Sequence, residues 1–354
     1  MTGQRNEFGV QIRAGIFAVS RVGLVLLLLL TCFIGTTRAQ ASGTPLLDAK
    51  ALLADVDILR QAYTTLHPGL YRYNTPAQID QAFERLASRL RTVTTLKDAY
   101  LAFSLFAAEV RCGHTYTNFY NQKKTLQQSL FTGPRVPFYF RWISGKMIVT
   151  RSFSKDSRIK SGTEIVSING VPSSKILARL MTIARADGSN DAKREAYLEV
   201  QGHDRYEAFD IFLPLFFDTP REKMQLLIKP YGERKSLTLT EVPLTYEQRL
   251  AAMKGEEENQ NRDVFQFRFL DEGTALLVMP SWALYNSKWD WKSFLDRSFE
   301  SLIAKGARDL IIDIRSNEGG QDIGDVVISH LSKEPVPRES LVRRVRYRSV
   351  PAEL

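Results

Sequence analysis

The fold of this chain is decided by the stretch LIIDIRSNEGG, which occupies residues 310–320. Its first half is a mostly apolar run, typical of a strand covered on both faces of a parallel sheet. The loop that follows ends in Gly319 and Gly320 and leads to a helix predicted from about Asp322 to Leu331. Strand, tight loop and helix form most of a right-handed βαβ unit, which needs one more parallel strand. The sequence therefore predicts an α/β architecture for this region.

Residues upstream of this stretch fit the same architecture. Strands are predicted at 264–270 and 275–279, on either side of a turn at Glu272-Gly273. Apolar residues between Trp291 and Ile303 recur at helical spacing, and Gly306 ends that helix.

The loop from Arg315 to Gly320 is a candidate for binding negative charge. It follows the carboxyl end of a predicted parallel strand, where unpaired N–H groups of the next helix point outward. The glycines let a substrate carbonyl approach the backbone closely, although a turn that needs positive φ explains them equally well. A phosphate site is not predicted, because the loop lacks both the Lys-Ser/Thr ending of a P-loop and the three-glycine dinucleotide pattern.

The region from Leu46 to Arg111 has helical periodicity. One helix ends at His67-Pro68-Gly69, and a second begins at the capping box Thr75–Gln78. A third, from Tyr100 to Val110, is apolar on nearly all sides and is expected to be buried. We expect it to end near Gly113, which places His114 just past a helix end.

His114 is a candidate general base, because imidazole titrates near neutral pH. The alternative is that it caps the helix or packs against it. No two histidines have metal-ligand spacing, and Cys112 is the only cysteine outside the amino-terminal apolar segment. We therefore predict no metal site and no cofactor.

Between Val136 and about Thr245, short strands alternate with turns. The strand Glu164–Ile168 is closed by Asn169-Gly170, a strong turn signal, and a helix follows from Ser173. Such a hairpin either accepts a peptide by strand addition or is an ordinary part of a β module. An inserted helical stretch is expected near 185–215, and Glu256-Glu257-Glu258 is expected to be a solvated linker or loop.

The amino terminus predicts export. A basic segment precedes the apolar run at 22–35, and Ala39-Gln40-Ala41 fits the small-x-small cleavage rule. The run is short for a membrane span, so cleavage before Ser42 is favoured over a retained anchor. A lipid on Cys32 is disfavoured, because a threonine precedes this cysteine. The expected location is the periplasm or the extracellular space, with no membrane contact beyond the signal peptide.

The composition is that of a globular protein. The 354 residues are 44% apolar and 25% charged, which excludes a disordered, collagen-like or disulfide-scaffold protein and suggests two or three domains. The net charge of +9 is spread over the chain, and the arginines from Arg338 to Arg348 fit a solvated strand edge. We expect no nucleic-acid partner.

Four motifs, in this order, resemble the tail-specific (carboxyl-terminal processing) serine peptidase family. They are His67–Tyr71 after a helix, Gly113-His114-Thr115, Gly162–Gly170 and Leu310–Gly320. More narrowly, the chain is similar to the branch related to the tricorn core and the retinoid-binding-protein repeats. The resemblance runs from about Leu46 to Leu331.

This resemblance implies an α+β multidomain protein. Its parts would be a signal peptide at 1–41, a helical domain at 42–134, a PDZ-like domain with a helical insertion at 135–246, and an incomplete crotonase-like α/β peptidase core at 247–354. The family's roles would assign the base to His114 and the oxyanion N–H groups to Gly319 and Gly320. The partner would be a peptide or an unfolded protein, and the oligomeric state is not indicated.

The sequence departs from the family at the nucleophile. Ser332, Ser340 and Ser349 lack a small-residue turn and a following helix, and Ser281 precedes the glycine loop and would be misplaced. We therefore expect this chain to be a truncated part of a longer secreted peptidase. Two functions stay open: a serine peptidase, with either a Ser-His or a Ser-Lys arrangement, and a catalytically inactive peptide-binding protein of the same fold.

Overall fold

The computed structural model describes residues 46–92, 95–259, 264–334, 345, 347–352 and 354. The predicted signal peptide at 1–41 lies outside the described residues, as do four of the arginines of the basic cluster, Arg338, Arg343, Arg344 and Arg346.

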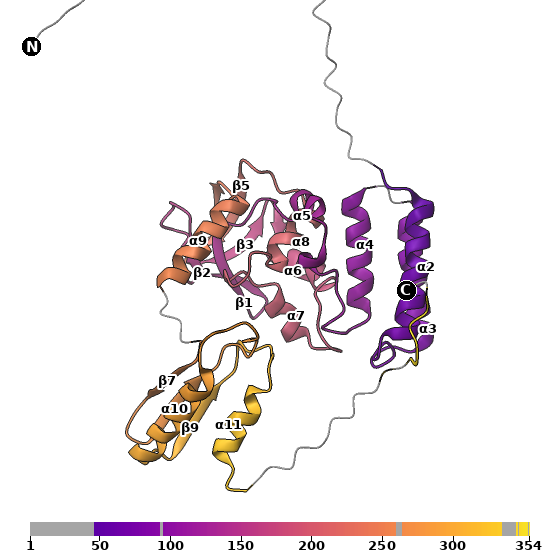
Figure 1. Cartoon of the computed structure of the whole chain (residues 1–354). Helices are drawn as coiled ribbons and strands as arrows, with labels where there is room; N and C mark the ends of the chain where they lie inside the picture. The colour runs from indigo at the N-terminus through magenta and orange to yellow at the C-terminus, as the bar shows by residue number, and fades with distance from the viewer. Residues whose placement is uncertain (1–45, 93–94, 260–263, 335–344, 346, 353) are drawn as a thin grey trace, which may run out of the picture. The chain divides into compact units, whose positions relative to one another are not determined.

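Three helices form the first part of the chain: α2 (Ala49–Leu66), α3 (Pro76–Arg91) and α4 (Leu96–Glu109). Figure 1 shows them beside one another. Each begins at a side-chain cap, since Asp48, Thr75 and Thr95 accept hydrogen bonds from N–H groups of the first turn. At Thr75 the predicted capping box with Gln78 is present. The three helices predicted from the sequence are confirmed.

Helix α4 lies between two hydrophobic cores. Ala102 and Phe106 pack with α2 and α3, whereas Tyr100 belongs to the core of the following region. The predicted burial of this helix is confirmed. It ends at Glu109, a few residues earlier than expected, and the chain then turns through Arg111 with a φ of 58°.

The middle region is built on a six-stranded antiparallel sheet in the order β1-β2-β3-β5-β6, with β4 paired to β3. Its strands are β1 (Phe138–Ile143), β2 (Lys146–Ser152), β3 (Glu164–Ile168), β4 (Val171–Pro172), β5 (Met224–Lys229) and β6 (Leu237–Glu241). Asn169 and Gly170 form the predicted turn with positive φ.

Helices surround this sheet: η2 (Phe119–Asn121), α5 (Lys124–Leu130), α6 (Ser173–Met181), α7 (Asp191–Tyr197), α8 (Ala208–Phe216) and α9 (Tyr246–Asn259). Helices α7 and α8 are the predicted insertion. Phe138, Phe140 and Phe209 are fully buried at the centre of the core that joins sheet and helices. Edge-to-face contact between Phe140 and Phe209, at 4.8 Å between ring centroids, joins α8 to β1.

Helix α9 overturns the expectation of a linker at 256–258, because these residues belong to its last turns. The helix begins with a reciprocal pair of hydrogen bonds between Thr245 and Gln248. Arg249 then fixes it to the sheet by donating to the carbonyl of Val136. Glutamate is a good helix former, so a polar run that looked like a linker continues a helix already started.

The last region holds a three-stranded sheet in the order β7-β8-β9, made of β7 (Gln266–Phe269), β8 (Thr274–Val278) and β9 (Asp309–Asp313). Strands β7 and β8 are antiparallel, and β8 and β9 are parallel. Helix α10 (Trp291–Lys305) connects the parallel pair, and α11 (Ile323–Leu331) follows β9. A βαβ unit is therefore present as β8-α10-β9. Of the unit predicted from residue 310 onward, the strand is β9 and the helix is α11, and no strand after α11 is among the described residues.

The expectation that the 310–314 strand is covered on both faces is wrong for the described residues. Leu310 and Ile312 pack into the core that contains α10 and α11, but Ile311 is 47% exposed. Both helices contribute to this one core, so they cover the same face of the sheet. Strand β9 also lies at the edge of the described sheet.

Among the described helices, none combines the length and the apolar character that a membrane span requires.

Candidate functional site

One cavity brings the three candidate site residues together. His114, Gly319 and Gly320 all line a space of about 1040 Å³. Its other walls come from the α7–α8 segment and from the loop after β8. The polar and ionisable side chains that line this cavity besides His114 are Arg185, Tyr197, Glu199, Gln201, His203, Asp204, Tyr206, Glu207, Ser281, Tyr285, Ser316 and Glu318.

The glycine loop is held against the end of β8 by Asn317. The Asn317 Nδ2 donates to the carbonyl of Met279 at 2.9 Å, and its Oδ1 accepts the N–H of Gly319 at 2.7 Å. The loop thus follows the carboxyl end of β9 as expected. It is fastened to the neighbouring strand by a side chain that sequence reasoning did not single out.

Gly320 packs so closely on Trp282 that no side chain fits. A Cβ atom at this position would lie 2.3 Å from the carbonyl carbon of Trp282. The φ of Gly320 is 142° and that of Gly319 is 88°, so both sit in backbone conformations that favour glycine. The explanation by positive φ therefore applies to both glycines. The atoms that Gly320 approaches closely belong to the chain's own backbone, and the approach of a substrate carbonyl stays a prediction.

The two amides of this pair differ in availability. The N–H of Gly319 is taken by Asn317, whereas the N–H of Gly320 has no acceptor among the residues that the structure describes. The loop therefore presents one open donor, and a second would require release of the Asn317 contact.

His114 lies in the turn after α4 and is exposed. Thr115, the next residue, is buried, and its Oγ1 lies 2.8 Å from the Nε2 of His67. The Nδ1 of His67 accepts the N–H of Gly69 at 3.2 Å, so the proton of a neutral His67 ring sits on Nε2 and is donated to Thr115. His67 thus supports the His114 turn.

His114 also lines a second cavity, of about 1040 Å³. His67, Tyr71, Tyr73 and Cys112 are among its lining residues. His114 therefore lines both cavities.

A cluster of buried charges borders the first cavity. Arg249 lies 3.5 Å from Glu207 and 3.3 Å from Asp210, and Arg135 donates to the carbonyl of Asp210 at 2.6 Å. Burial, and then repulsion by Asp210, raises the pKa of Glu207 to about 7. The Oε1 of Glu207 accepts the N–H groups of Gln201 and Gly202 at 2.7 and 2.8 Å. This carboxyl group therefore shapes the loop that carries His203.

Two serines line the cavity of His114. One is Ser281, set aside as misplaced on sequence grounds, and the other is Ser316. The Oγ of Ser281 accepts the N–H of Ala283 at 3.1 Å. Within the described ranges, neither serine is hydrogen-bonded to His114, and no group of three or more His, Cys, Asp or Glu side chains could hold a metal ion.

Comparison with known proteins identifies the class of the carboxyl-terminal region. Residues 273–352 match the model of peptidase family S41. The resemblance drawn from the sequence motifs is thereby supported: this region, which includes the glycine pair, is similar to a family of serine peptidases.

Solved structures extend the likeness over most of the chain. A crystal structure of a mutant of CPAF matches with a TM-score of 0.50 and 14% identity, covering 78% of this chain and 57% of CPAF. A structure of mature CPAF complexed with lactacystin matches with a TM-score of 0.52 and 14% identity, covering 80% and 59%. At this identity the likeness shows a shared α+β fold. The chain spans less than two thirds of the length of these structures, and no curated protein matches it.

Proposed function

We propose that the protein is a serine-type peptidase that cleaves unfolded or carboxyl-terminal peptide segments by acyl transfer. His114 is the general base, and the N–H of Gly320 stabilises the oxyanion. The observation that carries this proposal is the common cavity, to which His114 comes from the end of α4 and Gly320 from the loop after β9.

The chemistry follows from these two groups. A serine hydroxyl attacks the scissile carbonyl carbon as the imidazole of His114 takes its proton. The carbonyl oxygen becomes an oxyanion that accepts the N–H of Gly320, and that of Gly319 once the Asn317 contact opens. The imidazolium then gives its proton to the leaving amine, and water releases the acyl group. The attacking serine is identified by the labelling experiment described below.

Substrate binding and export complete the proposal. The antiparallel sheet β1–β6, with α6 following its hairpin, is a PDZ-like module that takes extended peptide by strand addition. The partial α/β region, with its parallel β8-β9 pair, is crotonase-like. The basic and apolar amino terminus supports secretion to the periplasm or the extracellular space.

Hydrolysis of fluorescein-labelled casein, an unfolded protein, tests the activity. Wild-type protein should cleave it, and His114→Ala should lower the rate by roughly 10²–10⁴-fold. His330→Ala is the matched control, because His330 pairs with Asp296 between α11 and α10 and lines neither cavity. Retained turnover in His114→Ala would remove this residue from the mechanism.

A fluorophosphonate probe then identifies the nucleophile, because it labels an activated serine that peptide mapping can locate. Binding of casein without cleavage or labelling, and with equal affinity in wild type and His114→Ala, would favour the inactive peptide-binding protein instead.

A further inference from the structure

Residues 185–188 hold the turn that carries His114 through both backbone groups of the residue before it, Gly113. Arg185 donates from Nη1 to the carbonyl of Gly113 at 2.9 Å, and Asp187 accepts the N–H of Gly113 at 3.2 Å. The N–H of Gly188 also donates to the carbonyl of Arg111 at 2.9 Å. The residue immediately before His114 therefore has both backbone groups bound by one distant segment.

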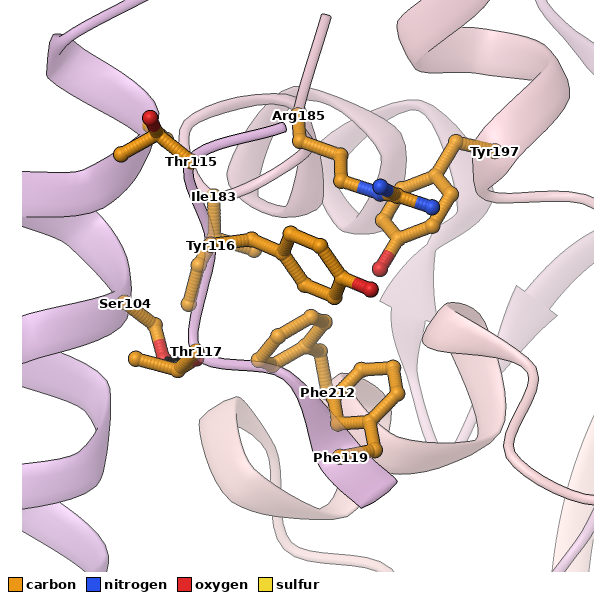
Figure 2. Close-up of a pocket in the computed structure, with 10 residues that line it drawn as sticks. Ser104, Thr115, Tyr116, Thr117, Phe119, Ile183, Arg185, Tyr197 and Phe212 are labelled. Carbon is orange, nitrogen blue, oxygen red and sulfur yellow. Dashed lines mark hydrogen bonds between the residues drawn. The ribbon is translucent and has the colours of Figure 1, made fainter. Parts of the chain in front are cut away.

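The side chain of Arg185 is itself fixed by aromatic rings. Its guanidinium carbon lies 4.0 Å from the ring centroid of Tyr116 and 5.1 Å from that of Tyr197, and Figure 2 shows the group next to both rings. Burial raises the pKa of Tyr197 to about 12, so this ring stays neutral beside the cation. Two aromatic contacts and one carbonyl leave the planar guanidinium little freedom.

The contacts of Arg185 flank the candidate base in sequence. Gly113 precedes His114, and Tyr116 follows it after Thr115. Because Thr115 is held by His67, each residue on either side of His114 has a fixed contact. The imidazole itself is left exposed to the cavity, which Arg185 also lines.

Glycine at position 113 leaves room for the carboxylate of Asp187. A Cβ atom there would lie 3.2 Å from the Oδ2 of Asp187, so this carboxylate would have to shift by a few tenths of an ångström. The Gly-His-Thr motif thus has a local explanation: glycine admits the carboxylate, and threonine binds the second histidine.

We propose that Arg185 is a positioning residue for His114, and the proposal rests on the function proposed above. In this role Arg185 acts through the turn and takes no part in the proton transfers. It holds the Gly113 carbonyl and the Tyr116 ring, and thereby fixes the residue between them in the wall of the cavity that the glycine loop also lines. Misplacement of a catalytic group by about 1 Å can cost roughly 10²-fold in rate, so this restraint has a measurable effect on turnover.

Hydrogen exchange of single amides, followed by NMR in the full chain, tests the restraint without any activity. The N–H of Thr115 donates to the carbonyl of Cys112 at 2.9 Å, so its exchange reports on the turn. We expect Arg185→Ala to accelerate exchange at Gly113 and Thr115 at least tenfold. Arg185→Lys should do the same, because an ammonium keeps the charge but loses the planar stacking.

Arg179→Ala is the matched control. The Arg179 guanidinium also stacks on an aromatic ring, that of Phe216 at 4.3 Å, but this residue lines no cavity of the site. It should leave both amides unchanged. Exchange that is equally slow in wild type and in both Arg185 variants would overturn the proposal.

Turnover of labelled casein gives the second readout. Both Arg185 variants should lose about 10²-fold in kcat with KM changed less than threefold, and millimolar guanidinium should restore part of the kcat of Arg185→Ala. An unchanged kcat would overturn the positioning role. If wild type itself fails to cleave while exchange still responds to Arg185, the proposed function falls and the restraint on the turn stands.

Discussion

Replacement of Gly320 by alanine gives a sharp test of the geometry at the glycine loop. The added Cβ atom would meet the carbonyl carbon and oxygen of Trp282 at 2.3 Å and the nitrogen of Ala283 at 2.4 Å. These are backbone atoms of a segment that bridges to Gly320, so no side-chain rotation can relieve the contact. Gly319→Ala is a matched control one residue away, because a Cβ atom there has no neighbour within 4 Å.

The expected cost can be worked out from these contacts. Alanine at position 319 meets only the penalty of a positive φ, about 1–2 kcal/mol of unfolding free energy. Alanine at position 320 meets a backbone penalty of similar size together with an overpacking cost of about 1–3 kcal/mol, giving about 2–5 kcal/mol in all. Gly320→Ala should therefore be the more destabilising variant by about 1–3 kcal/mol.

Denaturant unfolding followed by tryptophan fluorescence measures this difference. Three of the four tryptophans, Trp282, Trp289 and Trp291, lie in the region of the glycine loop, so the signal reports mainly on that region. A lower midpoint at unchanged slope would show a change in stability alone. If Gly320→Ala unfolds at the same denaturant concentration as Gly319→Ala, the close approach of Trp282 to the loop is wrong.

Three further predictions concern the buried charges and the amino terminus. The carboxyl of Glu207 has a pKa of about 7 in the folded chain against 4.5 for an ordinary glutamate, so the unfolded chain releases this proton first. Stability should therefore fall as pH rises from about 4.5 to 7. Glu207→Gln keeps an oxygen for the bonds to Gln201 and Gly202 and should flatten that fall, which urea unfolding at several pH values would detect. Arg135→Met removes the Nε group that lies 3.8 Å from the Oδ2 of buried Asp210 and should cost about 3–5 kcal/mol in calorimetry. Its control, Arg158→Met, alters only a partly exposed pair with Asp156 and should leave the unfolding midpoint unchanged. Sequencing of the exported protein should find Ser42 at or next to its amino terminus, and an intact Met1 would refute the signal peptide.

Local patterns explain why much of the fold could be predicted from the sequence. Periodicity and caps located α2 and α3, because a capping box and an apolar stripe are properties of neighbouring residues. The Asn169-Gly170 turn was predictable for the same reason. The expectation that the 310–314 strand is covered on both faces failed, because coverage depends on residues far away in the sequence. An apolar run around Ile311 indicates a strand but does not say which faces receive a covering helix.

The candidate site divides in the same way. His114, Gly319 and Gly320 stand in motifs, and sequence reasoning could single them out. Arg185 and Glu207 carry no local signal, because an arginine or a glutamate reads as a surface residue until its partners are known. The contact of Arg185 with Gly113 joins positions that are far apart in the chain, and only the fold brings them together.

Helix α4 has a consequence for how the chain can be divided. Phe106 belongs to one hydrophobic core and Tyr100 to the other, so both cores need this helix. A fragment that begins after α3 would expose Phe106 and the rest of that face of α4 to water. Thermal unfolding of the three-helix region should also disturb the turn of His114, which follows α4. Dividing the chain between α3 and α4 would therefore separate two regions that we expect to unfold together.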